Sequence, residues 1–312
     1  MSQVAIIGAG LIGRAWTIVF ARAGWNVRVW DPVADARAAA PGLLRTSMED
    51  LHAHELLGDV EAALARVTMC DSLPSAVAGT DLVQENGPEI LDLKRSVFRE
   101  LDLHAPRGTI LASSSSAIVA SLFTEGLAGA ARCIIAHPVN PPHLIPVVEL
   151  CGSPWTSTET IATAREIYEA VGQIPVVVNR ELEGFVLNRL QGALLAEAFR
   201  LVGEGVISPS DLDKTVKDGL GLRWSFMGPF ETIDLNAPGG IDDYCKRYTG
   251  FYRRLSENSA PPEVWDRPNI EKILEAWGDP SGSQTRQSRS ERRDRRLAAL
   301  LVHKKRSGEP GQ

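Results

Sequence analysis

The chain has 312 residues, a net charge of −6 and a hydrophobic fraction of 44%. Because one hydrophobic core seldom serves more than about 250–300 residues, we expect two domains. The acidic balance gives no general attraction for nucleic acid or an anionic membrane, and no window approaches the ~20 apolar residues of a membrane span.

The cysteines and the first residues indicate the compartment. The four cysteines are scattered without CxxC spacing, which favours free thiols in a reducing cytosol over a zinc site or a disulfide framework. The apolar run after the first methionine has no basic flank and is too short for a secretory signal. We therefore expect a cytoplasmic protein that binds no metal.

The chain opens with a strand and a glycine-rich turn. Residues 3–7 form a near-continuous apolar run, typical of a strand buried on both faces of a parallel sheet. They lead into G-x-G-x-x-G at Gly8, Gly10 and Gly13, and a helix is predicted over residues 12–23. In such a turn the first glycine permits the bend, the second leaves room for a pyrophosphate, and the third lets the helix pack closely on the strand.

An acidic residue ends the second predicted strand. Residues 26–30 are followed by Asp31, where a carboxylate would accept hydrogen bonds from the adenosine ribose and repel the extra phosphate of NADP. The structural alternative is a helix N-cap before Pro32. With a strand before the glycine turn and a helix after it, the pattern favours ribose recognition and NAD.

The next segment is helical and contains no lysine. Residues 32–66 are rich in alanine, leucine and acids, and short strands are predicted at 67–70 and 82–85. A helix that ends near residue 103 follows, with Glu89 before it and Lys94 within it. From the residues alone, we interpret Glu89 as a helix-start acid and Lys94 as a solvated lysine.

Four consecutive serines follow a further buried strand. Residues 109–112 lead directly into the run 113–116. The hydroxyls could form an ordinary turn or an N-cap, or one of them could hydrogen-bond a substrate oxygen. The pattern does not choose among the four.

A histidine and a glutamate lie twelve residues apart across a proline-broken turn. His137 ends one apolar run and Glu149 ends the next, so neighbouring strands could bring the carboxylate beside the imidazole. An imidazole titrates near neutral pH, and a carboxylate on its far nitrogen fixes the tautomer and stabilises the protonated ring, as proton transfer from an alcohol requires. The structural alternative is a turn or core histidine. A helix over 158–171 and a strand over 174–178 complete a sheet of about eight strands.

Helices dominate from residue 183 onward. They are predicted over residues 184–204, 208–218, 229–236, 241–255 and 262–277. A polar linker over 279–288 and a terminal helix over 290–302 follow. Residues 286–306 contain nine basic and two acidic side chains. We favour a solvated helix that docks its leucines on a partner subunit over a nucleic-acid arm, because the segment lacks interleaved aromatics.

Several motifs give the chain a family resemblance from about Val4 to Trp277. They are IIGAGLIGRAW, ENGPEILDLKRSVF, ASSSSA, AHPVNPPHLIPVVEL, GFVLNRLQGALLAEAFRLV, SPSDLD and GLGLRWSFMGPFETIDLN. The sequence resembles the 3-hydroxyacyl-CoA dehydrogenase superfamily and, within it, the branch of lambda-crystallin and L-gulonate 3-dehydrogenase. The resemblance implies an α/β fold: a Rossmann-like, mostly parallel sheet domain (1–181), an all-α domain (182–278), and a linker with a basic helix (279–312).

The resemblance also implies roles for individual residues. The general base falls on His137, the carboxylate that orients it on Glu149, the substrate-binding serine on Ser116, and an asparagine near the reacting carbon on Asn188. The implied NAD contacts, besides the three glycines, are Leu11, Ile12, Asp31, Glu89 and Lys94.

Charge bears on the substrate. A coenzyme A thioester carries phosphates that call for lysine and arginine, whereas residues 32–66 are lysine-free and net acidic. We therefore expect oxidation of the 3-hydroxyl of a small free acid, of the L-gulonate type, with Arg223 either clamping the carboxylate or forming a surface salt bridge. The alternatives are a short-chain 3-hydroxyacyl-CoA dehydrogenase and a non-catalytic, NADH-binding structural protein. Family likeness and apolar helix faces suggest a homodimer.

Overall fold

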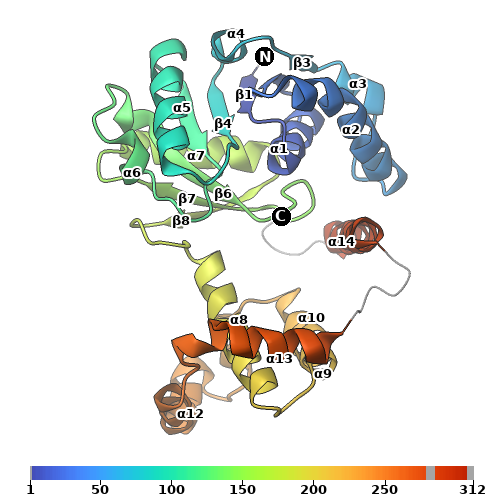
Figure 1. Cartoon of the computed structure of the whole chain (residues 1–312), viewed down its shortest axis with the longest axis vertical. Helices are drawn as coiled ribbons and strands as arrows, with labels where there is room; N and C mark the ends of the chain where they lie inside the picture. The colour runs from blue at the N-terminus through green and yellow to red at the C-terminus, as the bar shows by residue number, and fades with distance from the viewer. Residues whose placement is uncertain (1, 279–284, 308–312) are drawn as a thin grey trace. The chain divides into compact units, whose positions relative to one another are not determined.

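The computed structural model describes residues 2–278 and 285–307 (Figure 1). The described chain divides into two units, the first formed by residues up to Asn188 together with the C-terminal helix from Ser290, and the second by residues from Arg189 to Arg289. Within the described residues, no helix is both long and apolar enough to cross a membrane.

An eight-stranded sheet forms the centre of the first unit. Its spatial order is β3-β2-β1-β4-β5-β6-β7-β8, and every neighbouring pair is parallel except β6 and β7. The strands are β1 (Gln3–Ile7), β2 (Asn26–Trp30), β3 (Val67–Met69), β4 (Leu82–Glu85), β5 (Ile110–Ser113), β6 (Cys133–Pro138), β7 (Val147–Gly152) and β8 (Ile174–Val178). The first six strands have the order of a doubly wound dinucleotide-binding fold, which confirms the predicted Rossmann-like architecture.

Helices cover both faces of this sheet. They are α1 (Leu11–Arg22), α2 (Ala34–Ala53), α3 (Val60–Leu64), α4 (Leu73–Val77), α5 (Leu91–His104), α6 (Ser121–Thr124), the 3₁₀ turn η1 (Ala130–Arg132) and α7 (Thr158–Ala170). Because successive strand residues point to opposite faces, Val4 and Ile6 pack with α1, α2 and α7, whereas Ala5 and Ile7 pack with α4, α5 and α6. Figure 1 shows α5 and α6 on one side of the sheet and α1 and α2 on the other.

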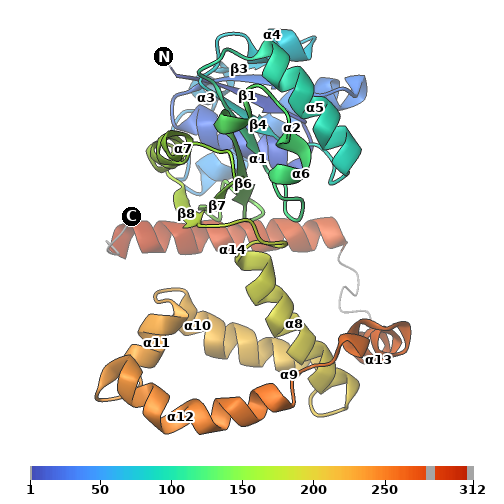
Figure 2. The ribbon, with the colours of Figure 1, turned by 90° about the vertical axis from the view of Figure 1, so that its left-hand side faces the viewer.

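The second unit is helical, as predicted. It contains most of α8 (Leu187–Gly203), then α9 (Pro209–Lys214), a π-helical segment η2 (Thr215–Leu220), α10 (Gly221–Trp224), α11 (Pro229–Leu235), α12 (Gly240–Glu257), the 3₁₀ turn η3 (Pro262–Trp265) and α13 (Arg267–Trp277). Figure 2 shows α9, α10 and α11 following one another before the chain turns back into α12.

Two predicted helix starts were wrong. The helix expected from residue 184 begins at Leu187, because Gly184 and Phe185 have φ of +75° and +47°, outside the helical region. The terminal helix α14 (Arg286–Ser307) begins four residues before the expected start. Most of the predicted linker lies outside the described residues.

Leu297 and Leu301 of α14 pack on the first unit of the same chain, so the predicted docking of these leucines on a partner subunit was wrong. Ala298 belongs to the core on the α1 face of the sheet, and Leu297, Leu301 and Val302 pack against that core. The helix repeat brings these residues to one side of α14. The helix therefore completes the apolar cover of the first unit.

Candidate active site

His137 and Glu149 form a buried dyad on two neighbouring strands. They are directly opposite in the antiparallel register of β6 and β7, and Nδ1 of His137 lies 2.8 Å from Oε2 of Glu149. The side chains are 7% and 2% exposed. Residues opposite each other on antiparallel strands bring their Cβ atoms within about 5.5 Å, so the register itself creates the pair. The predicted pairing of the two side chains is confirmed.

The second oxygen of Glu149 accepts hydrogen bonds from the start of α8. The backbone N–H groups of Val186 and Leu187 donate to Oε1 at 2.9 and 3.0 Å. Burial alone would raise the pKa of Glu149, but the hydrogen bonds from His137 and from these two N–H groups outweigh burial and lower the pKa. The carboxylate therefore stays ionised and holds the imidazole through Nδ1.

Phe185 packs against the imidazole of His137. Its ring centroid lies 5.5 Å from that of His137, and its side chain is fully buried. Its positive φ is uncommon for a bulky residue and marks a site where the surroundings impose the backbone conformation. The sequence did not single out Phe185, because a phenylalanine beside a glycine has no special pattern.

The hydrogen bonds of the serine run distinguish its four members. The first three commit their hydroxyl protons within the fold: Ser113 to Glu85 at 2.6 Å, Ser114 to Asn86 at 2.7 Å, and Ser115 to the carbonyl of Ile118 at 2.7 Å and the carboxylate of Glu89 at 2.9 Å, which share its one proton. Ser114 also accepts from Trp16 and Gln84, which uses its full capacity of one donor and two acceptors. The hydroxyl of Ser116 makes one bond, to Glu89 at 3.1 Å, and keeps acceptor capacity for a ligand.

Glu89 organises the end of the serine run. Its carboxylate accepts from the hydroxyl of Ser115 at 2.9 Å, the N–H of Ala117 at 2.9 Å, and both the N–H and the hydroxyl of Ser116. Burial would raise the pKa of Glu89, but these hydrogen bonds and the charge of Lys94 lower it. The ionised carboxylate of Glu89 therefore holds residues 115–117 in place through hydrogen bonds.

Lys94 is buried, so its interpretation as a solvated lysine was wrong. Its side chain is 2% exposed, and Nζ lies 3.0 Å from Glu85 and 3.7 Å from Glu89. A lysine is almost never fully buried unless it is paired, and here the paired carboxylates border the serine run. Glu85 was missed by sequence reasoning, although an acid that ends an apolar strand is a usable signal. A direct contact of Lys94 with the cofactor stays a prediction.

Asn188 also meets the serine run. Its Nδ2 donates to the carbonyl of Ser116 at 3.1 Å. Asn188, at the start of α8, therefore contacts Ser116, the residue that the family resemblance assigns to substrate binding. The two predicted substrate residues of the first unit thus lie together.

A cavity of about 270 Å³ opens on these groups. Its lining residues are Ile12, Asn86, Gly87, Glu89, Ser114, Ser116, His137, Pro138 and Asn140. It joins the helix after the glycine turn, the serine run and the imidazole of His137 at the carboxyl ends of the parallel strands, where ligands bind in open α/β sheets.

The glycine turn fits a dinucleotide. Gly8 has φ +97°, a Cβ on Gly13 would lie 1.8 Å from the Gly8 carbonyl oxygen, and a Cβ on Gly10 would meet nothing within 4 Å. No side chain caps the N-terminus of α1, where Leu11 is exposed, so its first N–H groups are available to phosphate. The three glycines thus have the predicted geometry.

Asp31 lies beside this turn at the end of β2. Its Oδ2 accepts from the N–H of Ala9 at 2.7 Å and its Oδ1 from the N–H of Val33 at 2.8 Å. Each carboxylate oxygen keeps a second acceptor site for a ribose hydroxyl. The N-cap of α2 is Val33, so the N-cap alternative for Asp31 was wrong.

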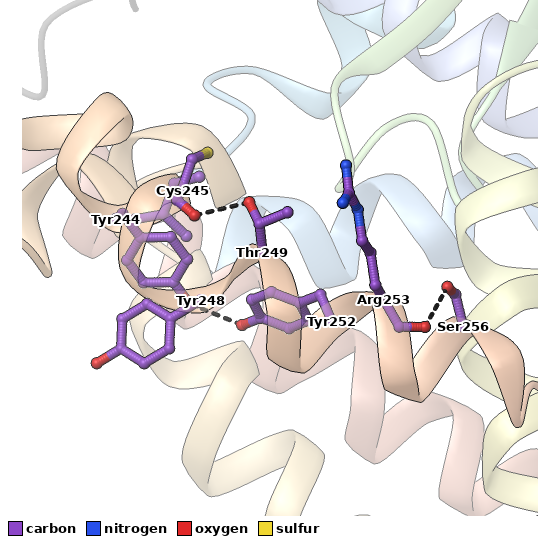
Figure 3. A pocket seen from close by; sticks show the side chains of 8 residues that line it. Tyr244, Cys245, Tyr248, Thr249, Tyr252, Arg253 and Ser256 are labelled. Atoms are coloured by element: carbon purple, nitrogen blue, oxygen red, sulfur yellow. Dashed lines mark hydrogen bonds between the residues drawn. The ribbon is translucent and has the colours of Figure 1, made fainter.

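The second unit, considered by itself, contains Arg223 and an aromatic groove. Arg223 is exposed on α10, and its clamp role stays a prediction. A groove of about 510 Å³ runs along α12. Figure 3 shows side chains that line it, among them Tyr244 and Tyr252, whose hydroxyls form a hydrogen bond of 2.7 Å. Tyr248 packs on Tyr244 with ring centroids 4.6 Å apart and the ring planes tilted by 43°, and Cys245 is exposed beside them.

Fold and site together define an NAD-dependent dehydrogenase that acts on a CH–OH group. Residues 3–182 match the family model of the 3-hydroxyacyl-CoA dehydrogenase NAD-binding domain, and residues 184–272 match that of its C-terminal domain. The chain belongs to the 3-hydroxyacyl-CoA dehydrogenase family.

Relatives agree with this assignment. Rabbit (Oryctolagus cuniculus) lambda-crystallin is 42% identical over 277 residues, which cover 88% of this chain and 86% of that protein. An L-carnitine dehydrogenase from Streptomyces coelicolor is 36% identical over 270 residues, covering 85% and 84%. The crystal structure of 5-formyl-3-hydroxy-2-methylpyridine 4-carboxylic acid 5-dehydrogenase, an NAD⁺-dependent dismutase, has a TM-score of 0.83 and 31% identity, covering 99% and 100%. The predicted resemblance to the lambda-crystallin branch is confirmed.

Proposed function

We propose that the protein oxidises the 3-hydroxyl of a small free hydroxy acid, of the L-gulonate type, with His137 as the general base. The observation that carries the proposal is the His137–Glu149 dyad, which borders a cavity shared with Ser116 and the helix of the cofactor turn.

His137 takes the hydroxyl proton through Nε2. Because the ionised Glu149 accepts from Nδ1, the neutral ring carries its proton on Nδ1 and presents a lone pair on Nε2. As Nε2 takes up the substrate proton, the carboxylate stabilises the imidazolium. NAD, bound at the glycine turn, supplies the hydride acceptor.

Ser116 and Asn188 position the substrate oxygen. Glu89 holds the serine through both its N–H and its hydroxyl, and Asn188 holds it through the carbonyl. Three hydrogen bonds from two side chains hold Ser116, so little reorganisation is needed when the alcohol becomes a carbonyl.

The arginines of residues 32–66 support a free acid over a coenzyme A thioester. This segment has no lysine. Arg37 donates to the carbonyl of Asp31, Arg45 to Glu61, and Arg66 to the carbonyl of Gly24. Cations already engaged in the fold are poorly placed to bind the phosphates of a nucleotide. The carnitine dehydrogenase among the relatives is likewise named for a free hydroxy acid.

The second unit supports a homodimer. Among its described residues, the buried side chains are Pro209, Thr232, Ala237 and Val264. Its exposed large apolar residues include Phe230, Leu235, Phe251, Tyr252 and Leu255. So few buried residues cannot offset the conformational entropy of an ordered unit of this size, and pairing with a second copy would bury the aromatic face of α12. Light scattering at micromolar concentration should give twice the chain mass, and a monomer would contradict the dimer.

Two alternatives remain distinguishable by assay. A short-chain 3-hydroxyacyl-CoA dehydrogenase would turn over acetoacetyl-CoA with saturation, and the family model favours this candidate. A non-catalytic, NADH-binding structural protein would bind NADH and turn over neither class of substrate.

A His137→Asn variant tests the base. We expect kcat to fall about 10²–10⁴-fold with NADH affinity unchanged. His104→Asn is the matched control, since His104 lies on α5, paired with Glu100, and should keep full activity. Near-normal turnover by the His137→Asn variant would show that His137 is not the general base.

A further inference from the structure

A buried glutamine ties three strands together behind the cofactor pocket. Gln84 in β4 is fully buried. Its Nε2 donates to the hydroxyl of Ser114, just beyond β5, at 2.7 Å and to the carbonyl of Ala136 in β6 at 3.4 Å. Its register partner in β5 is Ala112, whose small side chain leaves room for the amide to cross. One side chain therefore links the strand ends that precede the serine run and His137.

The phenol of Tyr168 fixes the orientation of this amide. Tyr168, on α7, is fully buried and donates its hydroxyl to Oε1 of Gln84. Burial raises the pKa of Tyr168, so the phenol keeps its proton and acts as the donor. Because the carbonyl of Ala136 can only accept, the amide nitrogen must face it and the amide oxygen must face Tyr168.

The fixed amide sets the direction of the Ser114 proton. The hydroxyl of Ser114 accepts from Gln84 and from the indole of Trp16, at 2.7 and 3.1 Å, so its one proton points to Oδ1 of Asn86 at 2.7 Å. The Nδ2 of Asn86 then donates to the carbonyls of Gln84 and Ile7 at 2.8 and 3.3 Å.

Asn86 is where this network reaches the pocket. It lines the cavity together with Ile12 and His137. Its backbone also borders the cofactor turn, since a Cβ on Gly8 would lie 3.0 Å from the Asn86 carbonyl oxygen. A shift of Asn86 would therefore alter the wall against which the dinucleotide binds.

We propose that Gln84 and Tyr168 are positioning residues for the cofactor: the phenol orients the buried amide, the amide orients Ser114, and Ser114 holds Asn86 against the glycine turn. The inference rests on the NAD chemistry of the family and not on the identity of the hydroxy acid. It is therefore testable with NADH alone, whatever the outcome of the substrate assays.

A Tyr168→Phe variant removes the first donor and keeps the ring, which packs on Trp16 and Phe20. Thr109→Val is the matched control. Thr109 is equally buried and its hydroxyl donates to the carbonyl of Thr80, but it lies at the opposite, amino-terminal end of β5. Both variants lose one buried hydrogen bond, so both should melt at a lower temperature than the parent protein.

NADH titration, followed by the change in protein fluorescence, separates positioning from stability. We expect Tyr168→Phe to weaken NADH binding about five- to tenfold, as the loss of one network hydrogen bond allows, and Thr109→Val to leave it within about twofold. In Tyr168→Phe the Michaelis constant for NAD should rise by a similar factor, and this factor should be larger than the factor by which kcat falls. Equal NADH affinity in parent and Tyr168→Phe, or equal weakening in both variants, would overturn the proposal.

A second variant guards against misfolding of the first. Ser114→Ala deletes only the hydroxyl at the centre of the network and should weaken NADH binding to a similar extent. Because the residues act as one unit, the Tyr168→Phe/Ser114→Ala double variant should bind NADH no more weakly than the weaker single variant. Additive losses would mean that the two hydroxyls act independently and would contradict the proposed chain.

Discussion

We expect replacement of Glu149 by glutamine to reverse the tautomer of His137, the proposed general base. The new side-chain oxygen can still accept from the backbone N–H groups of Val186 and Leu187. The new amide NH₂ then faces Nδ1 of His137, where the carboxylate oxygen lies at 2.8 Å in the parent protein. Since an NH₂ group can only donate, Nδ1 must accept, and the ring proton moves to Nε2. The nitrogen that faces the substrate is then no longer a base.

The size of the effect follows from this geometry. The tautomer change removes general base catalysis, worth typically 10²–10⁴-fold, and a comparable carboxylate-to-amide change in serine proteases costs about 10⁴-fold in kcat. We therefore expect kcat to fall about 10²–10⁴-fold, which corresponds to roughly 2.7–5.5 kcal/mol in activation free energy. NADH affinity should not change, because the dyad's hydrogen bonds in the described chain join the two side chains to each other and to the start of α8, and none goes to the glycine turn.

Steady-state oxidation of the hydroxy acid and a parallel NADH titration measure the two quantities. Glu181→Gln is the matched control, because Glu181 also accepts from a backbone N–H, that of Ser121 at 2.7 Å, but has no imidazole partner. Its kcat should stay within about twofold of the parent value. A Glu149→Gln enzyme that keeps more than a tenth of the parent kcat, with full NADH binding, would refute the proposed role of the carboxylate.

Further predictions concern stability. The pKa of Glu149 is lower in the folded protein than in the unfolded chain. The ionised carboxylate therefore stabilises the fold fully above the usual glutamate pKa, and this stabilisation is lost as pH falls through the folded value. In denaturant unfolding, the parent protein should have a higher unfolding free energy than Glu149→Gln at pH 7, and the difference should shrink below about pH 4.5. Gly13→Ala should melt at a lower temperature than Gly10→Ala, because a methyl on Gly13 would overlap the carbonyl of Gly8 whereas one on Gly10 meets no atom within 4 Å; equal melting temperatures would contradict this. Leu301→Ser should lower the unfolding free energy by about 1–3 kcal/mol and Leu300→Ser by less than about 0.5, because only Leu301 packs on the core.

The sequence predicts the sheet and the dyad because both depend on local patterns. The buried runs and the glycine turn give the strand and helix order, and an imidazole and a carboxylate on two consecutive apolar runs give the pair His137 and Glu149. Two strands joined by a short turn are expected to be neighbours, so the spacing of twelve residues predicts the pairing without knowledge of distant parts of the chain.

The choice among the serines requires three dimensions. Whether a serine hydroxyl is free to bind a ligand depends on partners distant in sequence. Glu85, for example, takes the proton of Ser113, and Asn86 takes that of Ser114. The burial of Lys94 has the same origin, since Glu85 pairs with it from the end of a neighbouring strand. Hydrogen-bond satisfaction between elements is a tertiary property, and residue spacing alone does not determine it.

The docking of α14 also depends on tertiary structure. Its leucine face is visible in the helix repeat, but only packing shows that Ala298, with Leu297 and Leu301 beside it, completes the core on the α1 face. An apolar helix face predicts burial without naming the surface that buries it.

The central measurement is NADH formation by the purified protein at alkaline pH, with L-gulonate and, separately, with L-3-hydroxybutyryl-CoA. We expect reduction of NAD with L-gulonate and none with the thioester, which would make Arg223 the next residue to replace. If the thioester alone reacts, the engaged arginines of residues 32–66 do not decide the substrate class, and the free-acid proposal is wrong.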